Sequence, residues 1–113
     1  MLYTTINVKD KEYKLRLTAR ACVDLEKKLG TNPINVFMKI AESNTLPSME
    51  DIITIFHATL QPLQHNITMN DAYDIFDEYV DDGHNLMDLV PTIIKVFQES
   101  GLIPKEGEES KNA

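Results

Sequence analysis

The segment from Glu12 to Phe37 restricts the possible folds most, because its apolar period changes from two to about 3.6 residues within it. The alternating part predicts a strand that is buried on one face. After Thr18, apolar residues recur every three or four positions, which predicts a helix that Gly30 ends. Asn32-Pro33 is a cap followed by proline, and this pair begins a second helix. In the strand, the apolar residues Tyr13, Leu15 and Leu17 alternate with the cationic Lys14 and Arg16.

A β-hairpin is predicted over residues 2–17. The first residues, Leu2 to Val8, also alternate between apolar and polar, and the polar Lys9-Asp10-Lys11 connects them to the strand described above. No third strand is apparent downstream. Since an isolated two-stranded hairpin is marginally stable in water, either a layer of helices or the strands of another chain must hold it.

Five helices are predicted from apolar periodicity and caps, at about residues 18–30, 33–43, 48–63, 68–82 and 86–100. Ser48 with Asp51, and Thr68 with Asp71, resemble capping boxes. The third helix has the longest apolar stripe, which indicates the centre of the core. Pro91 predicts either a kink or the true start of the last helix. The fold class is therefore α+β, mainly α, with one domain over 1–103 and a disordered tail over 104–113.

Charge and composition exclude several classes of partner. The net charge of −7 over 113 residues works against nucleic acid and against anionic membranes. The N-terminus lacks the basic and apolar segments of an export signal, and the single cysteine, Cys22, allows no internal disulfide. We therefore expect a protein of the bacterial cytosol.

The sequence predicts no enzyme. His57, His65 and His84 lack the spacing of zinc ligands, and the glycines are too scattered for a phosphate loop. Cys22 lies on the apolar side of its helix, so we interpret it as a core residue and not as a nucleophile. No catalytic residue, metal, cofactor or small-molecule substrate is expected.

The fourth predicted helix carries an acidic face, formed by Asp71, Asp74, Glu78 and Asp81. The residues lack the loop in which calcium-binding proteins place their carboxylates, so a metal site is not expected. Two interpretations stay open: a solvated helix face, and a surface that binds a basic partner.

The two helices on either side of Gly30 also allow a helix-turn-helix transcription regulator, or another protein-interaction adaptor. The second helix would read the DNA, yet Lys39 is its only basic residue. Contacts to bases and phosphates favour Arg, Lys, Asn and Gln. The regulator is therefore the alternative interpretation.

The segments KEYKLRLTARACVDLEKKLG and NPINVF, after a short first strand, resemble the tail assembly chaperones of long-tailed, siphovirus-type bacteriophages, in particular those of Gram-positive hosts. The similarity is strongest over residues 6–40 and looser to about residue 103. It implies a non-enzymatic protein of the host cytoplasm that binds the tape measure protein, helps recruit tail tube subunits and is absent from the finished virion. The family pattern assigns no individual binding residue.

A self-association surface is predicted at the first strand. Two strands leave unpaired backbone groups along both outer edges, and the segment before Lys9 carries no charge that would protect its edge. The candidate edge residues are Leu2, Thr4, Ile6 and Val8. If this edge binds a neighbouring copy, proline at Ile6 should remove a donor and weaken the association.

Overall fold

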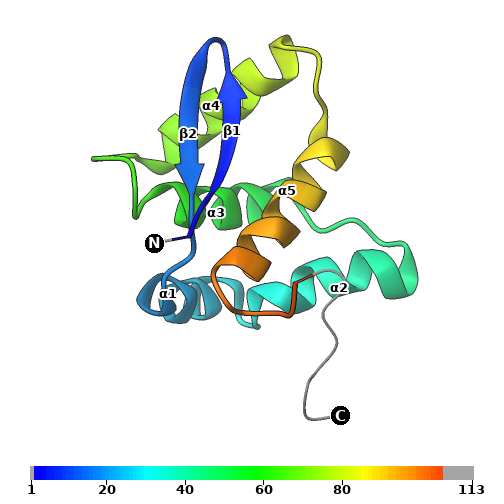
Figure 1. Ribbon diagram of the computed structural model, residues 1–113. Helices are drawn as coiled ribbons and strands as arrows, with labels where there is room; N and C mark the ends of the chain where they lie inside the picture. The colour runs from blue at the N-terminus through cyan, green and yellow to red at the C-terminus, as the bar shows by residue number, and fades with distance from the viewer. Residues whose placement is uncertain (1, 106–113) are drawn as a thin grey trace.

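The computed structural model describes residues 2–105, except for the side chain of Ala41, and contains an N-terminal hairpin and five helices (Figure 1). The α+β, mainly helical fold class is confirmed. Most of the predicted tail, residues 106–113, lies outside the described residues. The elements are β1 (Thr4–Val8), β2 (Lys11–Leu15), α1 (Ala19–Leu29), α2 (Pro33–Ser43), α3 (Met49–Leu60), α4 (Met69–Asp81) and α5 (Leu86–Glu99).

The hairpin is shorter than the predicted 2–17. Strands β1 and β2 pair antiparallel, with Val8 opposite Lys11 and Thr4 opposite Leu15. The turn consists of Lys9 and Asp10 alone, with φ angles of 50° and 65°. Two successive positive φ angles are typical of the tight turn whose twist matches that of the strands. Lys11 therefore belongs to β2 and not to the connection.

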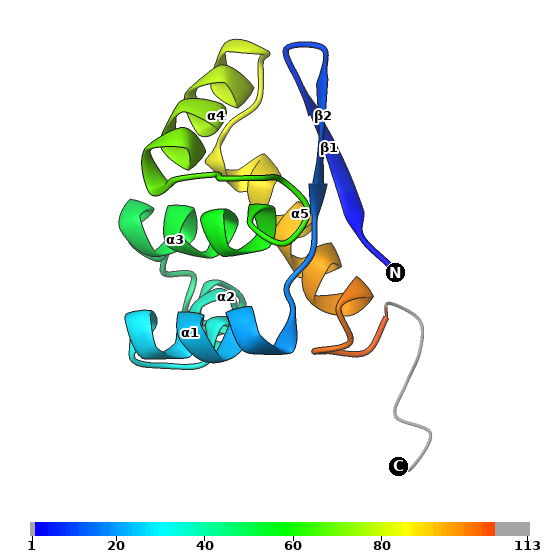
Figure 2. The same ribbon diagram turned by 90° about the vertical axis from the view of Figure 1, so that its left-hand side faces the viewer.

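One face of the hairpin packs on the helices. Its inward side chains are buried, and β1 contacts α4 and α5 while β2 contacts α3. Helices α4, α3 and α1 are stacked one below the other on one side of the hairpin, to its left in Figure 2. Helix α3 lies in the middle of this stack, and the predicted central position of the third helix is confirmed. The buried hairpin residues are Thr4, Ile6, Val8, Tyr13 and Leu15.

Side-chain caps account for most helix starts. Thr68 and Asp71 form a complete capping box at α4, as predicted. At α3 the prediction was wrong in part, because Ser48 accepts from the Asp51 N–H at 3.1 Å without the reciprocal bond of a box. A second complete box, Asn85 with Asp88, begins α5, and the sequence analysis missed it.

One helix boundary differs from the prediction, and one of the two alternatives left open for Pro91 is excluded. Helix α3 ends at Leu60 and not near residue 63, because Pro62 has no N–H to continue the helical bonds. Pro91 does not begin α5 but lies inside it. The bond that Pro91 cannot donate would go to Met87, which is exposed, so water can satisfy that carbonyl.

An aromatic pair joins α2 to α5. The rings of Phe37 and Phe97 lie edge to face, with centroids 5.6 Å apart and planes at 77°. Both side chains are buried. None of the helices in residues 2–105 is both long enough and apolar enough to cross a membrane.

Candidate functional site

The outer edge of β2 is covered by the chain itself at Lys14 and Arg16. The Lys14 N–H donates to Gln64 Oε1 at 2.8 Å, and Gln64 Nε2 donates to the Lys14 carbonyl at 2.8 Å. Two residues after Lys14, the Arg16 N–H donates to the Thr59 carbonyl at 2.9 Å. The Gln64 amide thus occupies the position of a neighbouring strand, and β2 is closed to further pairing there.

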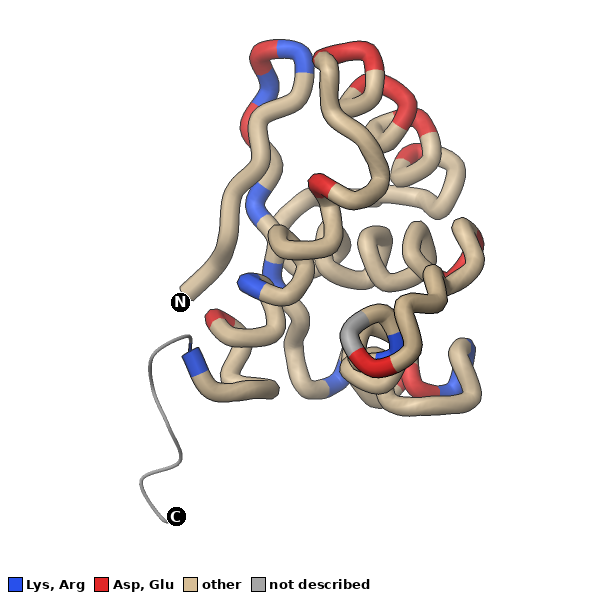
Figure 3. Tube along the Cα trace, turned by 90° about the vertical axis from the view of Figure 1, so that its right-hand side faces the viewer, with Lys and Arg blue, Asp and Glu red and all other residues tan. Residues whose placement is uncertain are grey.

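The outer edge of β1 is different. Hydrogen-bonded and non-hydrogen-bonded pairs alternate along an antiparallel ladder, so Thr5, opposite Lys14, also points its backbone groups away from the hairpin, as does Asn7. Within residues 2–105 no hydrogen bond reaches these two N–H groups. A partner is present at the turn of the hairpin, where the Lys9 N–H donates to Asp82 Oδ2 at 2.6 Å. Helix α5 lies beside this edge and not across it (Figures 1 and 3).

The residues predicted for the self-association edge need correction. Thr4, Ile6 and Val8 face β2 with their backbone groups and the core with their side chains. Of the four predicted residues, only Leu2 is exposed. The edge itself is therefore offered by Thr5 and Asn7. Proline at Ile6 would break the hairpin's own ladder and not test the edge.

The predicted acidic face lies beside the hairpin tip. Asp81 is 4.0 Å from Lys9 Nζ, and Asp74 and Glu78 line a small pocket together with Lys11. Figure 3 shows the acidic residues along α4 next to the lysines of the hairpin. The acidic face therefore already lies against lysines of its own hairpin.

Asp71 has a structural role within that face. Its Oδ2 accepts from the Thr68 N–H at 2.9 Å, and its own N–H donates to Thr68 Oγ1 at 3.0 Å. The bond from the Thr68 backbone holds the pKa of Asp71 below its ordinary value of 3.8, and the Thr68 side chain adds to this effect. The ionised carboxylate also suits the positive end of the helix.

This cap predicts a pH dependence. Because the pKa of Asp71 is lower in the folded chain, its stabilising contribution is complete above pH 3.8 and is lost as the pH falls through the lowered value. Asp71→Ala should therefore be less stable than the wild type at pH 7, and the difference should shrink below pH 3.8. Urea unfolding followed by circular dichroism at several pH values measures it. Asp77→Ala, on the same helix but outside the cap, serves as the control, and a difference independent of pH would contradict the prediction.

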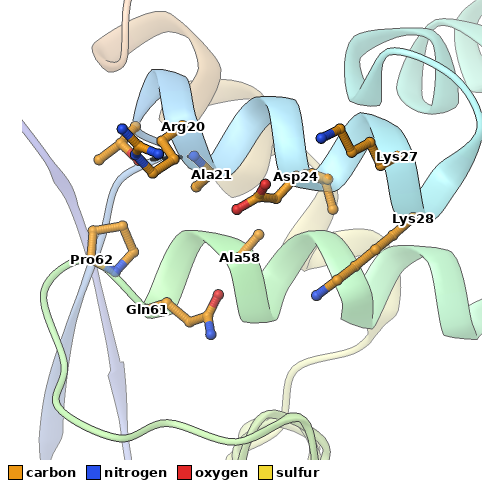
Figure 4. Close-up of a pocket in the computed structure, with 10 residues that line it drawn as sticks. Arg20, Ala21, Asp24, Lys27, Lys28, Ala58, Gln61 and Pro62 are labelled. Atoms are coloured by element: carbon orange, nitrogen blue, oxygen red, sulfur yellow. Dashed lines mark hydrogen bonds between the residues drawn. The ribbon is translucent and has the colours of Figure 1, made fainter.

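A groove between α1 and α3, called here the α1–α3 groove, was not predicted. It has a volume of about 720 Å³, with Ala21 and Leu25 on one side and Ala58 and Pro62 on the other. Figure 4 shows Lys28 reaching from α1 toward α3. The polar and charged lining residues are Thr18, Arg20, Asp24, Lys27, Lys28 and Gln61.

The sequence did contain part of the information from which the groove could have been predicted. Arg20, Lys27 and Lys28 are spaced by seven and eight residues, which places them on one side of a helix. The opposite wall comes from the end of α3, about 30 to 40 residues further along the chain. No local pattern relates those two segments.

The histidines and the cysteine lie apart. His57 is buried, with Nε2 2.8 Å from the Ile67 carbonyl, and His84 stacks on Tyr79 at 4.3 Å. Burial raises the pKa of the half-buried Cys22 thiol, and Glu26 raises it further. In the part of the chain that the structure describes, no three His, Cys, Asp or Glu side chains are grouped to hold a metal ion.

These surfaces define the chain as a small α+β domain with one unpaired strand edge and one charged groove. The sequence profile of a family of unknown function, DUF6096, matches residues 2–113. The chain belongs to this family. No curated protein and no solved structure matches it.

Proposed function

We propose that the protein is a tail assembly chaperone of a long-tailed bacteriophage. Several copies bind the tape measure protein in the host cytoplasm, keep it soluble and help recruit tail tube subunits, without an enzymatic step and without entering the virion. The similarity over residues 6–40 supports this proposal, and that segment contains most of the hairpin, all of α1 and most of α2.

The outer edge of β1 is the observation that carries the proposal furthest. Its outward N–H groups at Thr5 and Asn7 have no hydrogen-bond partner within residues 2–105, whereas Gln64 covers β2. Such an edge accepts an extended segment through backbone bonds, which are largely independent of sequence. An extended segment of the tape measure protein that pairs with this edge would be bound without a fixed sequence motif.

Exposed apolar side chains offer contacts to a hydrophobic client. Met38, Leu46 and Met49 are each about half exposed, and they lie in the middle of α2, in the connection and at the start of α3. Methionine adapts to varied partner surfaces because its side chain is unbranched and polarisable. This part of the chain therefore suits a client without a fixed sequence motif.

Co-expression with a tape measure protein of a long-tailed phage whose own tail assembly chaperone belongs to the same family as this chain tests the function. We expect the tape measure protein to be soluble and to co-purify only when this chain is present. Thr5→Pro, which removes one outward donor of β1, should keep the circular dichroism spectrum and lose most of the complex. Glu12→Pro removes an outward donor on the other strand and should retain it.

A transcription regulator is the competing outcome. Helix α2 would have to read the DNA, and its exposed side chains include Met38 and only one cation, Lys39. A gel shift that shows sequence-selective, salt-sensitive binding would overturn the chaperone proposal. An insoluble tape measure protein in the presence of this chain would also overturn it.

A further inference from the structure

We infer that the α1–α3 groove binds the acidic outer face of α4 of a second copy, so that copies associate head to tail. The groove carries an unusual concentration of positive charge. Its lining includes Arg20, Lys27 and Lys28, three of the eleven lysines and arginines in a chain of net charge −7. Asp24 is the only carboxylate that lines it. Among residues 2–105, no carboxylate lies within 4.0 Å of these three cations.

Helix α4 supplies the complementary surface. Asp74, Asp77 and Glu78 are exposed, and no cation in the described part of the chain lies within 4.0 Å of them. Asp81 has the single distant contact to Lys9 described above. The apolar side of α4 is buried in its own core, so the face that remains outside is polar and negative. Among the described residues, the three cations of the groove and three of the four carboxylates on this face thus have no oppositely charged side chain within 4.0 Å.

The shape of the groove suits a helix face. Ala21 and Ala58 line the two opposing helices, and their short side chains leave the space that Figure 4 shows between α1 and α3. A helix that lies along a groove between two others presents residues spaced by three and four positions. Asp74, Asp77, Glu78 and Asp81 have that spacing.

One molecule cannot make this contact with itself. Helix α3 separates α1 from α4 in the stack of layers (Figure 2). The two surfaces are also different, so each copy offers one groove and one acidic face. When a copy uses its groove on one neighbour and its acidic face on another, such contacts produce open chains or rings.

The association must be weak and sensitive to salt. Exposed charges interact over a Debye length of about 8 Å at physiological ionic strength, and this length shrinks to about 3 Å at 1 M salt. The inference rests on the self-association that the proposed function requires, and not on the identity of the client. It is therefore tested with the purified chain alone.

Sedimentation velocity on the full chain is the experiment. We expect the wild type to show a mass that rises with concentration at about 0.05 M salt, and an association constant at least tenfold lower at about 0.5 M. Two charge-reversed variants are compared with it: Arg20→Glu/Lys28→Glu in the groove, and Asp74→Lys/Asp77→Lys on α4. Each should be monomeric alone and should keep the wild-type circular dichroism spectrum.

An equimolar mixture of the two variants decides the outcome. Every groove then faces an α4 of opposite charge again, so association should return in the mixture. The inference would be overturned if the mixture stays monomeric, or if a single variant associates like the wild type. It would also be overturned if the wild type is monomeric at every concentration. Thr5→Pro should associate normally in this assay. If it does not, β1 and not the groove makes the contact between copies, which also overturns the inference but leaves the chaperone proposal standing.

Discussion

Replacing Phe97 with alanine should lower the free energy of unfolding by about 3–5 kcal/mol. The side chain is 1% exposed and meets the ring of Phe37 edge to face, so the change removes apolar burial and the main aromatic contact between α5 and α2. The Leu102 N–H also donates to the Phe97 carbonyl at 2.8 Å, which fixes the position of the residue. Urea unfolding followed by circular dichroism measures the loss.

The scale of this effect follows from the size of the domain. Domains of this kind have total stabilities of about 5–15 kcal/mol, so the variant would lose about a fifth of that total or more. Met87→Ala is the matched control, because Met87 lies on the same helix and is 48% exposed. Its stability should change by no more than about 0.5 kcal/mol. Equal losses in the two variants would show that α5 does not pack through Phe97.

Replacing Gln64 with glutamate should destabilise the chain by about 1–3 kcal/mol at pH 7. Gln64 Nε2 donates to two carbonyls, those of Lys14 at 2.8 Å and Leu60 at 2.6 Å. A carboxylate has no proton to donate, so both bonds are lost and its charge faces two carbonyl oxygens. The bond from the Lys14 N–H can still form, which keeps the loss moderate.

Opening the edge of β2 should also change how the variant associates. The carbonyl of Lys14 would become available to other chains, and unpaired strand edges promote aggregation. Gln98→Glu makes the same chemical change at a partly exposed position on α5, away from the hairpin turn and from the α1–α3 groove, and should leave both properties unaltered. Light scattering and thermal unfolding compare the two variants. If Gln98→Glu aggregates equally, added charge and not the open edge is the cause.

Local signals allowed most of the elements to be predicted. The Asn32-Pro33 start and the left-handed Gly30, with a φ of 73°, act within a few residues of the chain, so their sequence pattern is sufficient. The Asn85 and Asp88 box has an equally local pattern, and the alternation of Leu2 to Val8 indicated the buried face of β1 correctly. What that pattern lacks is the direction of the backbone groups, which depends on the register with β2.

The long-range features were beyond such reasoning. Gln64 covers Lys14 across 50 residues, and nothing in the turn after α3 marks it as a partner of the hairpin. The α1–α3 groove similarly needs the end of α3 to lie against the start of α1. Sequence patterns report periodicity along the chain, whereas these features depend on which segments meet after folding.

The contact between the hairpin and α5 also determines when the domain can close during synthesis. The Leu17 N–H donates to Ser100 Oγ at 3.0 Å, and β1 packs against α5. The ribosome synthesises β1 before every helix, and it synthesises α5 after the other four helices. The inward side of β1 therefore cannot pack against α5 until late in synthesis. Until Ser100 has been added, Ile6 and Val8 lack part of their cover. The nascent chain is therefore most exposed to other chains just before the helix that completes it emerges.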